Sequence, residues 1–175
     1  MKNKIIELFS VVMVLCIYFS IFSINAFAAN AVISGFDLVD SNKHCDYDAN
    51  QSSYGSYITT AVQKWNNYKA GILMPDTILT IQDVKIIDTN SSNVIWAGKT
   101  EYLSARIQLN SYYLNNSSWN YNNRLKTVMH ELGHALGLGE NNYSLSTNVM
   151  KQGKSENTTL TVDDKASYDL AYTYY

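Results

Sequence analysis

The amino-acid sequence predicts an α+β domain in which a small mixed β-sheet is packed by three helices. Apolar residues recur at helical spacing in three stretches, which lie in the first half of the chain, in its centre and at its C-terminus. Between the first and second stretches, apolar and β-branched residues alternate with polar ones, as is typical of strands. The order helix, strands, helix, loop, helix favours one sheet covered by helices.

The first 28 residues have the layout of a secretory signal peptide. Lys2 and Lys4 form a positive start, residues 8–24 are mostly apolar, and residues 26–28 (Ala-Phe-Ala) match a cleavage site. An uncleaved membrane anchor is the alternative, because the apolar run is close to the lower length limit of a spanning helix. Cleavage after this site would leave residues 29–175 as a single extracellular domain, expected to be monomeric.

The elements outside the centre follow from local patterns. Residues 52–68 form an amphipathic helix, and Pro75 closes the connection that follows it. The last helix begins at Thr161, which forms a capping box with Asp164, and runs toward Tyr174. Strands are expected at residues 36–39, 77–88, 93–99 and 105–110.

The central helix contains the strongest motif of the chain. Asn122 or Asn123 can cap its start, and Gly137 with Gly139 can end it. Its apolar face carries Leu125, Val128, Met129, Leu132 and Leu136.

Within this helix, "HELGH" places two imidazoles on the opposite side from the leucines. His130 and His134 are one turn apart, so both rings can bind one metal ion. Zinc suits them, since imidazole nitrogen is among its preferred ligands and catalytic zinc sites combine three protein ligands with a water. Glu131 is adjacent to the first ligand, where its carboxylate can reach that water without binding the metal.

Gly133 and Gly137 lie in this short helix although glycine disfavours helices, so another structural requirement must favour glycine at these positions. Each glycine costs on the order of 1 kcal/mol relative to alanine. Gly137 would let the chain turn back so that residue 140 reaches the same metal.

The stretch "HELGHALGLGE", followed by "NVM", resembles the metzincin clan of zinc endopeptidases, and most closely its matrixin branch. The resemblance implies that His130 and His134 are zinc ligands, that Glu131 is the general base, and that Met150 lies in a turn beneath the metal. It also implies that the C-terminal helix closes the domain. The edge strand along the substrate would consist of Ala105, Arg106, Ile107, Gln108 and Leu109.

The chain departs from the family pattern at Glu140, which occupies the place of a third histidine or aspartate. A carboxylate is a legitimate zinc ligand, so two histidines and Glu140 can complete the site. Its negative charge should weaken the metal as a Lewis acid. The alternatives are His44 or another carboxylate as the third ligand, or a site without a third protein ligand. Glu156 has the separation found in a different zinc family, but its surroundings have no helical pattern.

Other candidate features carry less chemistry. Cys45 is the only cysteine outside the signal peptide and could cap the zinc, although a buried unpaired thiol is the simpler reading. The segment "DYDAN" at residues 46–50 offers oxygen ligands for Ca²⁺, but it lacks the glycine and distal glutamate of a helix-loop-helix calcium site.

These features lead us to expect a secreted zinc endopeptidase that acts on extracellular proteins or peptides. Glu140 keeps open the alternative of a catalytically weak zinc-binding module that acts by protein binding. The formal net charge is −2, and removal of two lysines and one glutamate with the signal peptide changes it to −3. We therefore expect no nucleic-acid partner, for which clustered basic residues would be needed.

Overall fold

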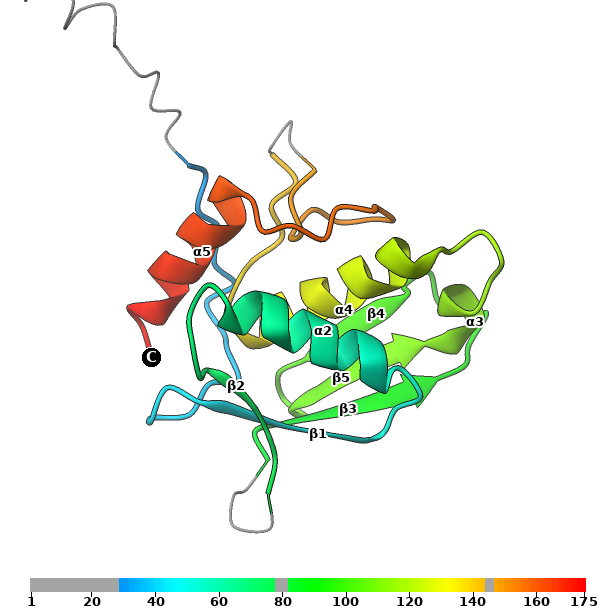
Figure 1. Ribbon diagram of the computed structural model, residues 1–175, viewed down its shortest axis with the longest axis horizontal. Helices are drawn as coiled ribbons and strands as arrows, with labels where there is room; N and C mark the ends of the chain where they lie inside the picture. The colour runs from blue at the N-terminus through cyan, green and yellow to red at the C-terminus, as the bar shows by residue number, and fades with distance from the viewer. Residues whose placement is uncertain (1–28, 78–81, 144–146) are drawn as a thin grey trace, which may run out of the picture.

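The computed structural model describes residues 29–77, 82–143 and 147–175, so the predicted signal peptide lies outside the described residues (Figure 1). Within these residues the fold is α+β with one mixed sheet, as the sequence predicts, and the sheet has five strands. The described residues form four helices where three were predicted. The strands are β1 (Cys45–Gln51), β2 (Leu73–Pro75), β3 (Val84–Thr89), β4 (Gly98–Glu101) and β5 (Arg106–Asn110). The helices are α2 (Gly55–Asn66), α3 (Ser111–Leu114), α4 (Tyr121–Ala135) and α5 (Val162–Tyr172).

The sheet has the strand order β2-β1-β3-β5-β4, and only β4 runs antiparallel to its neighbour. The prediction that residues 105–109 form the edge strand is wrong. Arg106 pairs with Lys85 of β3 on one side and with Glu101 of β4 on the other, so β5 is an inner strand. Ala105 precedes it with a positive φ of 48°. Strand β4 is the edge strand on this side of the sheet, and β2 forms the opposite edge.

Helix α4 lies beside β4 and packs against α2 (Figure 1). Its cap is Asn120, earlier than predicted, because the side chains of Asn120 and Asn123 each accept a hydrogen bond from the other's backbone amide. The predicted apolar faces of both helices are buried. Trp65 of α2 also donates a hydrogen bond from Nε1 to the carbonyl of Met129, 3.0 Å away. The two helices therefore form one core with the sheet.

Helix α5 begins with the predicted capping box of Thr161 and Asp164. Tyr168 meets the Trp65 ring edge-on, with 5.5 Å between ring centroids. Asp169 forms an ion pair of 2.7 Å with Lys69, just beyond the end of α2. These contacts hold α5 against α2.

The N-terminal segment does not form the strand predicted at residues 36–39. Its amides instead pair with carbonyls at the C-terminal end of α4, which a helix leaves without internal partners. Leu38 donates to the carbonyl of Ala135 at 2.8 Å, and Ser34 donates to that of Gly137 at 2.9 Å. The N-terminal segment therefore runs alongside the end of α4.

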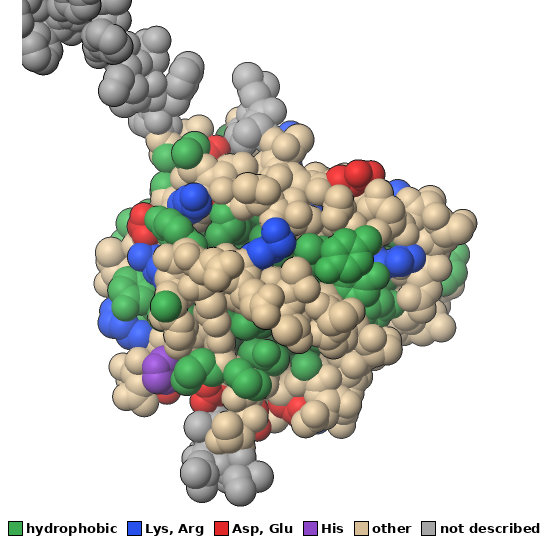
Figure 2. Space-filling model, viewed as in Figure 1, with side chains coloured by type: hydrophobic (Ala, Val, Ile, Leu, Met, Phe, Trp, Pro, Cys, Tyr) green, Lys and Arg blue, Asp and Glu red, His purple; other side chains and the backbone are tan. Residues whose placement is uncertain are grey.

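On the face in Figure 2, basic and acidic side chains are dispersed among neutral ones, without a continuous patch of one sign. Within the described part of the chain, no helix is both long and apolar enough to cross a membrane.

Candidate metal centre

After the end of α4, the chain reverses sharply and runs back toward His130 and His134. Gly137 has φ +82°, the left-handed conformation that glycine adopts readily. Its amide bonds to the carbonyl of His134, and the amide of Leu138 bonds to that of Gly133, both at 2.9 Å. This pair of bonds is a Schellman motif, which ends the helix sharply. The reversal brings Glu140 back beside α4.

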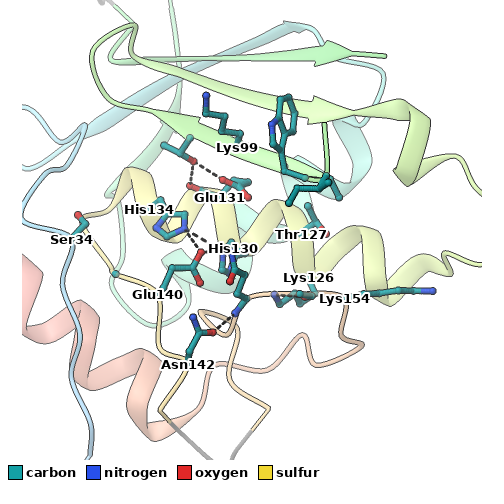
Figure 3. A pocket seen from close by; sticks show the side chains of 18 of the residues that line it. Ser34, Lys99, Lys126, Thr127, His130, Glu131, His134, Glu140, Asn142 and Lys154 are labelled. Atoms are coloured by element: carbon teal, nitrogen blue, oxygen red, sulfur yellow. Dashed lines mark hydrogen bonds and ion pairs between the residues drawn. The ribbon is translucent and has the colours of Figure 1, made fainter. Parts of the chain in front are cut away.

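His130, His134 and Glu140 converge on one point (Figure 3). The Nε2 atom of His130 lies 3.2 Å from that of His134 and 3.2 Å from Oε1 of Glu140. The His134 Nε2 atom lies 3.4 Å from the same carboxylate oxygen. Three ligand atoms at these separations could hold a metal ion.

The far nitrogens of both rings are fixed by backbone carbonyls. The Nδ1 atom of His130 lies 2.9 Å from the oxygen of Val149, and that of His134 lies 2.9 Å from the oxygen of Leu138. A carbonyl can only accept, so each Nδ1 donates, and the Nε2 of the neutral ring keeps its lone pair. Two lone pairs and a carboxylate oxygen then face one another, an arrangement that requires a proton or a metal cation between them.

The charges at the centre reinforce this requirement. Burial raises the pKa of Glu140, but hydrogen bonds to His130 and His134 outweigh it and lower the pKa to about 2. Burial lowers the pKa of His134, yet Glu140 and Glu131 reverse the effect and raise it overall. The carboxylate is therefore ionised, and Oε2 of Glu140 is buried with no partner among the described residues.

The loop beneath the histidines is held by one carboxylate. Oδ2 and Oδ1 of Asp164 accept hydrogen bonds from the amides of Val149 and Met150, each at 3.0 Å. Asp164 is almost fully buried and also caps α5. Since the Val149 carbonyl orients His130, Asp164 supports a candidate metal ligand through the backbone.

Met150 lies against the helix between the two histidines. A Cβ atom on Gly133 would overlap its sulfur and would also press on the Trp65 ring. Glycine is therefore required at position 133 because there is no room for a side chain. Gly139, predicted to help end the helix, instead lets the N-terminal segment approach, because its Cβ would lie 2.9 Å from the carbonyl oxygen of Ile33.

Glu131 lines the same cleft as the two histidines but is not part of the three-residue cluster. Its Oε2 atom lies 2.8 Å from the hydroxyl of Thr100 on β4. Gly98 of the same strand leaves room for it, since a Cβ there would lie 2.7 Å from both Cγ and Oε1 of Glu131. The edge strand therefore positions this carboxylate.

A cleft of about 1110 Å³ opens over the centre, between β4 and the segment that follows Met150. Figure 3 shows Glu131 and Lys99 on one side of α4, with Glu140 and Asn142 on the other. Trp96, Tyr113 and Trp119 add aromatic surface to its lining. The cleft is large enough for a segment of polypeptide.

The other candidate residues lie away from this cluster. His44 and Glu156 do not belong to the three-residue group, and Glu156 instead accepts a hydrogen bond from Asn120. Cys45 is fully buried in the core, where burial and neighbouring carboxylates raise the pKa of its thiol, so it cannot cap a metal in the cleft. Residues 46–50 belong to β1 and form no calcium loop.

No local pattern indicates the roles of Thr100 and Gly98, because these roles depend on where β4 meets α4. Asp164 was recognisable as a helix cap, but not as the acceptor for the loop amides. No family model matches this chain, and no curated protein matches it in sequence.

Proposed function

We propose that this protein is a secreted zinc-dependent endopeptidase of the metzincin type. The observation that carries the proposal is the spacing of the three ligand atoms, which lie 3.2–3.4 Å apart. A tetrahedral zinc ion with ligands at about 2.0–2.1 Å requires separations of about 3.3–3.4 Å. His130, His134 and Glu140 would hold the ion.

The choice of donors favours zinc over harder cations. Ca²⁺ and Mg²⁺ prefer six or more oxygen ligands, whereas two imidazoles and one carboxylate are a set that zinc uses in hydrolytic sites. Three protein ligands also leave a position for water, as catalytic rather than structural zinc sites do. All three proposed ligands line the cleft, so a water molecule could reach the open position from there.

Glu131 is suited to be the general base. Bound zinc would lower the pKa of a water molecule and polarise the scissile carbonyl. Thr100 holds one oxygen of Glu131, and the other lies beside Gly98 in the cleft lining. The carboxylate would take a proton from the attacking water and deliver it to the leaving amine.

The substrate would bind as an extended strand along β4. This strand forms the edge of the sheet next to α4, and β-strand addition needs such an edge. The substrate-binding role predicted for residues 105–109 is therefore assigned to Gly98–Glu101 in this proposal.

The test is cleavage of a mixed peptide library by the zinc-loaded protein, compared with Glu131→Gln. We expect cleavage by the wild type and by Glu156→Gln, whose carboxylate bonds to Asn120 outside the cleft, and at least about 100-fold slower cleavage by Glu131→Gln. Zinc stoichiometry should be the same in all three. If all bind zinc and none cleaves, the proposal fails in favour of a zinc-binding module.

A further inference from the structure

A buried lysine lies in the lining of the cleft, one helical turn before the first candidate ligand. Lys126 is 2% exposed and precedes His130 by four residues on α4. Figure 3 shows it near Lys154, on the side of α4 where the segment after Met150 runs. Its charge is therefore close to the place where a substrate would bind.

The ammonium group of Lys126 is only partly satisfied. Nζ donates to the carbonyls of Lys151 at 2.6 Å and Gly153 at 3.0 Å. An ammonium has three N–H donors, and none of the ion pairs among the described residues involves Lys126. Buried charges are normally paired, because desolvation without a counterion is costly.

The other lysines that line the cleft differ from Lys126. Lys99 forms an ion pair of 2.7 Å with Glu101. Lys154 is exposed and lies over the Trp119 ring, 5.3 Å from its centroid. Lys126 is thus the one buried cation among the cleft residues that the structure describes.

In the proposed function, the acidic residues of the cleft would be neutralised by the zinc ion. Glu131 and Glu140 are the carboxylates of the described lining, and a divalent zinc ion would balance their two charges. Asp164 also favours the charged form of Lys126, but its two oxygens accept hydrogen bonds from the Val149 and Met150 amides. Lys126 therefore forms no ion pair with a carboxylate of the described residues. A negative group supplied by the ligand would neutralise its charge.

We propose that Lys126 makes the cleft selective for a glutamate side chain next to the scissile bond of the substrate. This inference rests on the proposed endopeptidase function. Four residues of α4 span about 6 Å, whereas neighbouring residues of an extended peptide are about 3.3 Å apart. A long side chain from a residue that flanks the scissile bond can therefore reach Lys126.

The test compares peptides that carry Glu, Gln or Leu at each of the two residues flanking the cleaved bond. A hydrogen bond between the Lys126 ammonium and a carboxylate is stronger than one to an amide. We therefore expect kcat/KM to favour Glu over Gln by about tenfold or more at one position. Lys126→Met should reduce that ratio to near one, and Lys126→Arg should retain a preference for Glu. Lys154→Met is the matched control and should leave the ratio unchanged. A ratio near one in the wild type, or one that persists in Lys126→Met, would overturn the proposal.

A binding measurement separates this inference from the proposed function. Peptide hydroxamates with a Glu or Gln side chain next to the metal-binding group can be titrated calorimetrically into the zinc-loaded wild type. We expect the Glu compound to bind about tenfold more tightly or better. If no peptide is cleaved, the endopeptidase proposal fails, but this ratio still decides the role of Lys126. Equal affinities would reject selectivity even if Lys126→Met does not fold.

Discussion

Met150 occupies the space beside Gly133 that a side chain at position 133 would need. Gly133 lies between His130 and His134, so the turn presses directly on the part of α4 that carries both imidazoles. Met150 is fixed there from both sides of its backbone, because its amide bonds to Asp164 and its carbonyl accepts from Asn141 at 2.8 Å. A loop of the C-terminal half therefore supports the candidate metal centre from below.

This contact predicts that Gly133→Ala destabilises the protein. The added methyl group should overpack the core and lower the free energy of unfolding by about 1–3 kcal/mol, despite the better helix propensity of alanine. Urea unfolding of the two proteins measures the difference. Gly55→Ala is the control in α2, where no atom lies within 4 Å of the added Cβ, and it should be neutral or stabilising. Equal stability of Gly133→Ala and wild type would contradict the packing.

Removal of Glu140, the proposed third ligand, should weaken metal binding. Loss of outer hydrogen-bond partners already reduces the metal affinity of such sites by about 10–100-fold, so Glu140→Ala should lower zinc affinity by at least about 100-fold. Competition with a chromophoric chelator measures the affinity. Glu156→Ala should bind zinc as the wild type does, since its carboxylate bonds to Asn120 outside the cluster. Unchanged affinity in Glu140→Ala would remove that residue from the ligand set.

Thr100 should act through the orientation of Glu131. Thr100→Val keeps the shape of the side chain but removes the hydroxyl that lies 2.8 Å from Oε2. We expect kcat to fall by roughly tenfold while KM and zinc affinity stay the same, because the base loses its orienting hydrogen bond. Steady-state kinetics and zinc titration measure these quantities. Thr100→Ser should recover most of the rate, and equal kcat in Thr100→Val would argue against a positioning role.

The thiol of Cys45 should be inert in the folded protein. It is fully buried, and burial raises its pKa, so little thiolate forms at neutral pH. Ellman's reagent should react with it only after denaturation. Rapid reaction under native conditions would show that β1 opens readily.

The pH dependence of stability should reveal the charge of Lys126. Burial lowers its pKa from 10.5 to about 8, against the opposing effect of Glu140, Glu131 and Asp164. The folded state therefore holds this proton less tightly than the unfolded chain, and the charge costs stability below pH 8. That cost disappears as the pH rises from 8 to 10.5.

Relative to Lys126→Met, the wild type should gain stability across that interval. Urea unfolding of both proteins between pH 7 and 10.5 measures it, and the comparison cancels the titration of all other groups. A difference that does not change with pH would show that Lys126 titrates normally.

Local patterns were sufficient for the three longer helices of this fold, although not for the short helix α3. Ile58 and Trp65 lie on one side of α2 because their spacing follows the helical period, and Thr161 with Asp164 marks the start of α5. Two histidines four residues apart likewise identify half of the candidate site without long-range information. The sharp turn at Gly137 could also be anticipated, since it needs only one left-handed residue.

The sheet was harder to predict because its strands depend on partners far along the chain. Strand β1 has the sequence CDYDANQ, in which apolar and polar residues alternate, but its Asp and Asn residues are depleted in strands. It forms because β2 and β3 pair with its two sides. Strands β4 and β5 could not be ranked as edge and interior from their residues alone. For the same reason, the contact between Thr100 and Glu131 could not be predicted from the sequence.

Asp164 both caps α5 and holds the loop that orients His130, so the candidate metal centre depends on α5. Its carboxylate caps α5 and fixes the Val149 and Met150 amides, so the ring of His130 is aligned only when α5 is in place. During synthesis from the N-terminus, α4 leaves the ribosome before α5 does. A nascent chain that has exposed its histidines but not residue 164 would therefore lack an aligned centre, which delays any activity until almost the whole domain has been made.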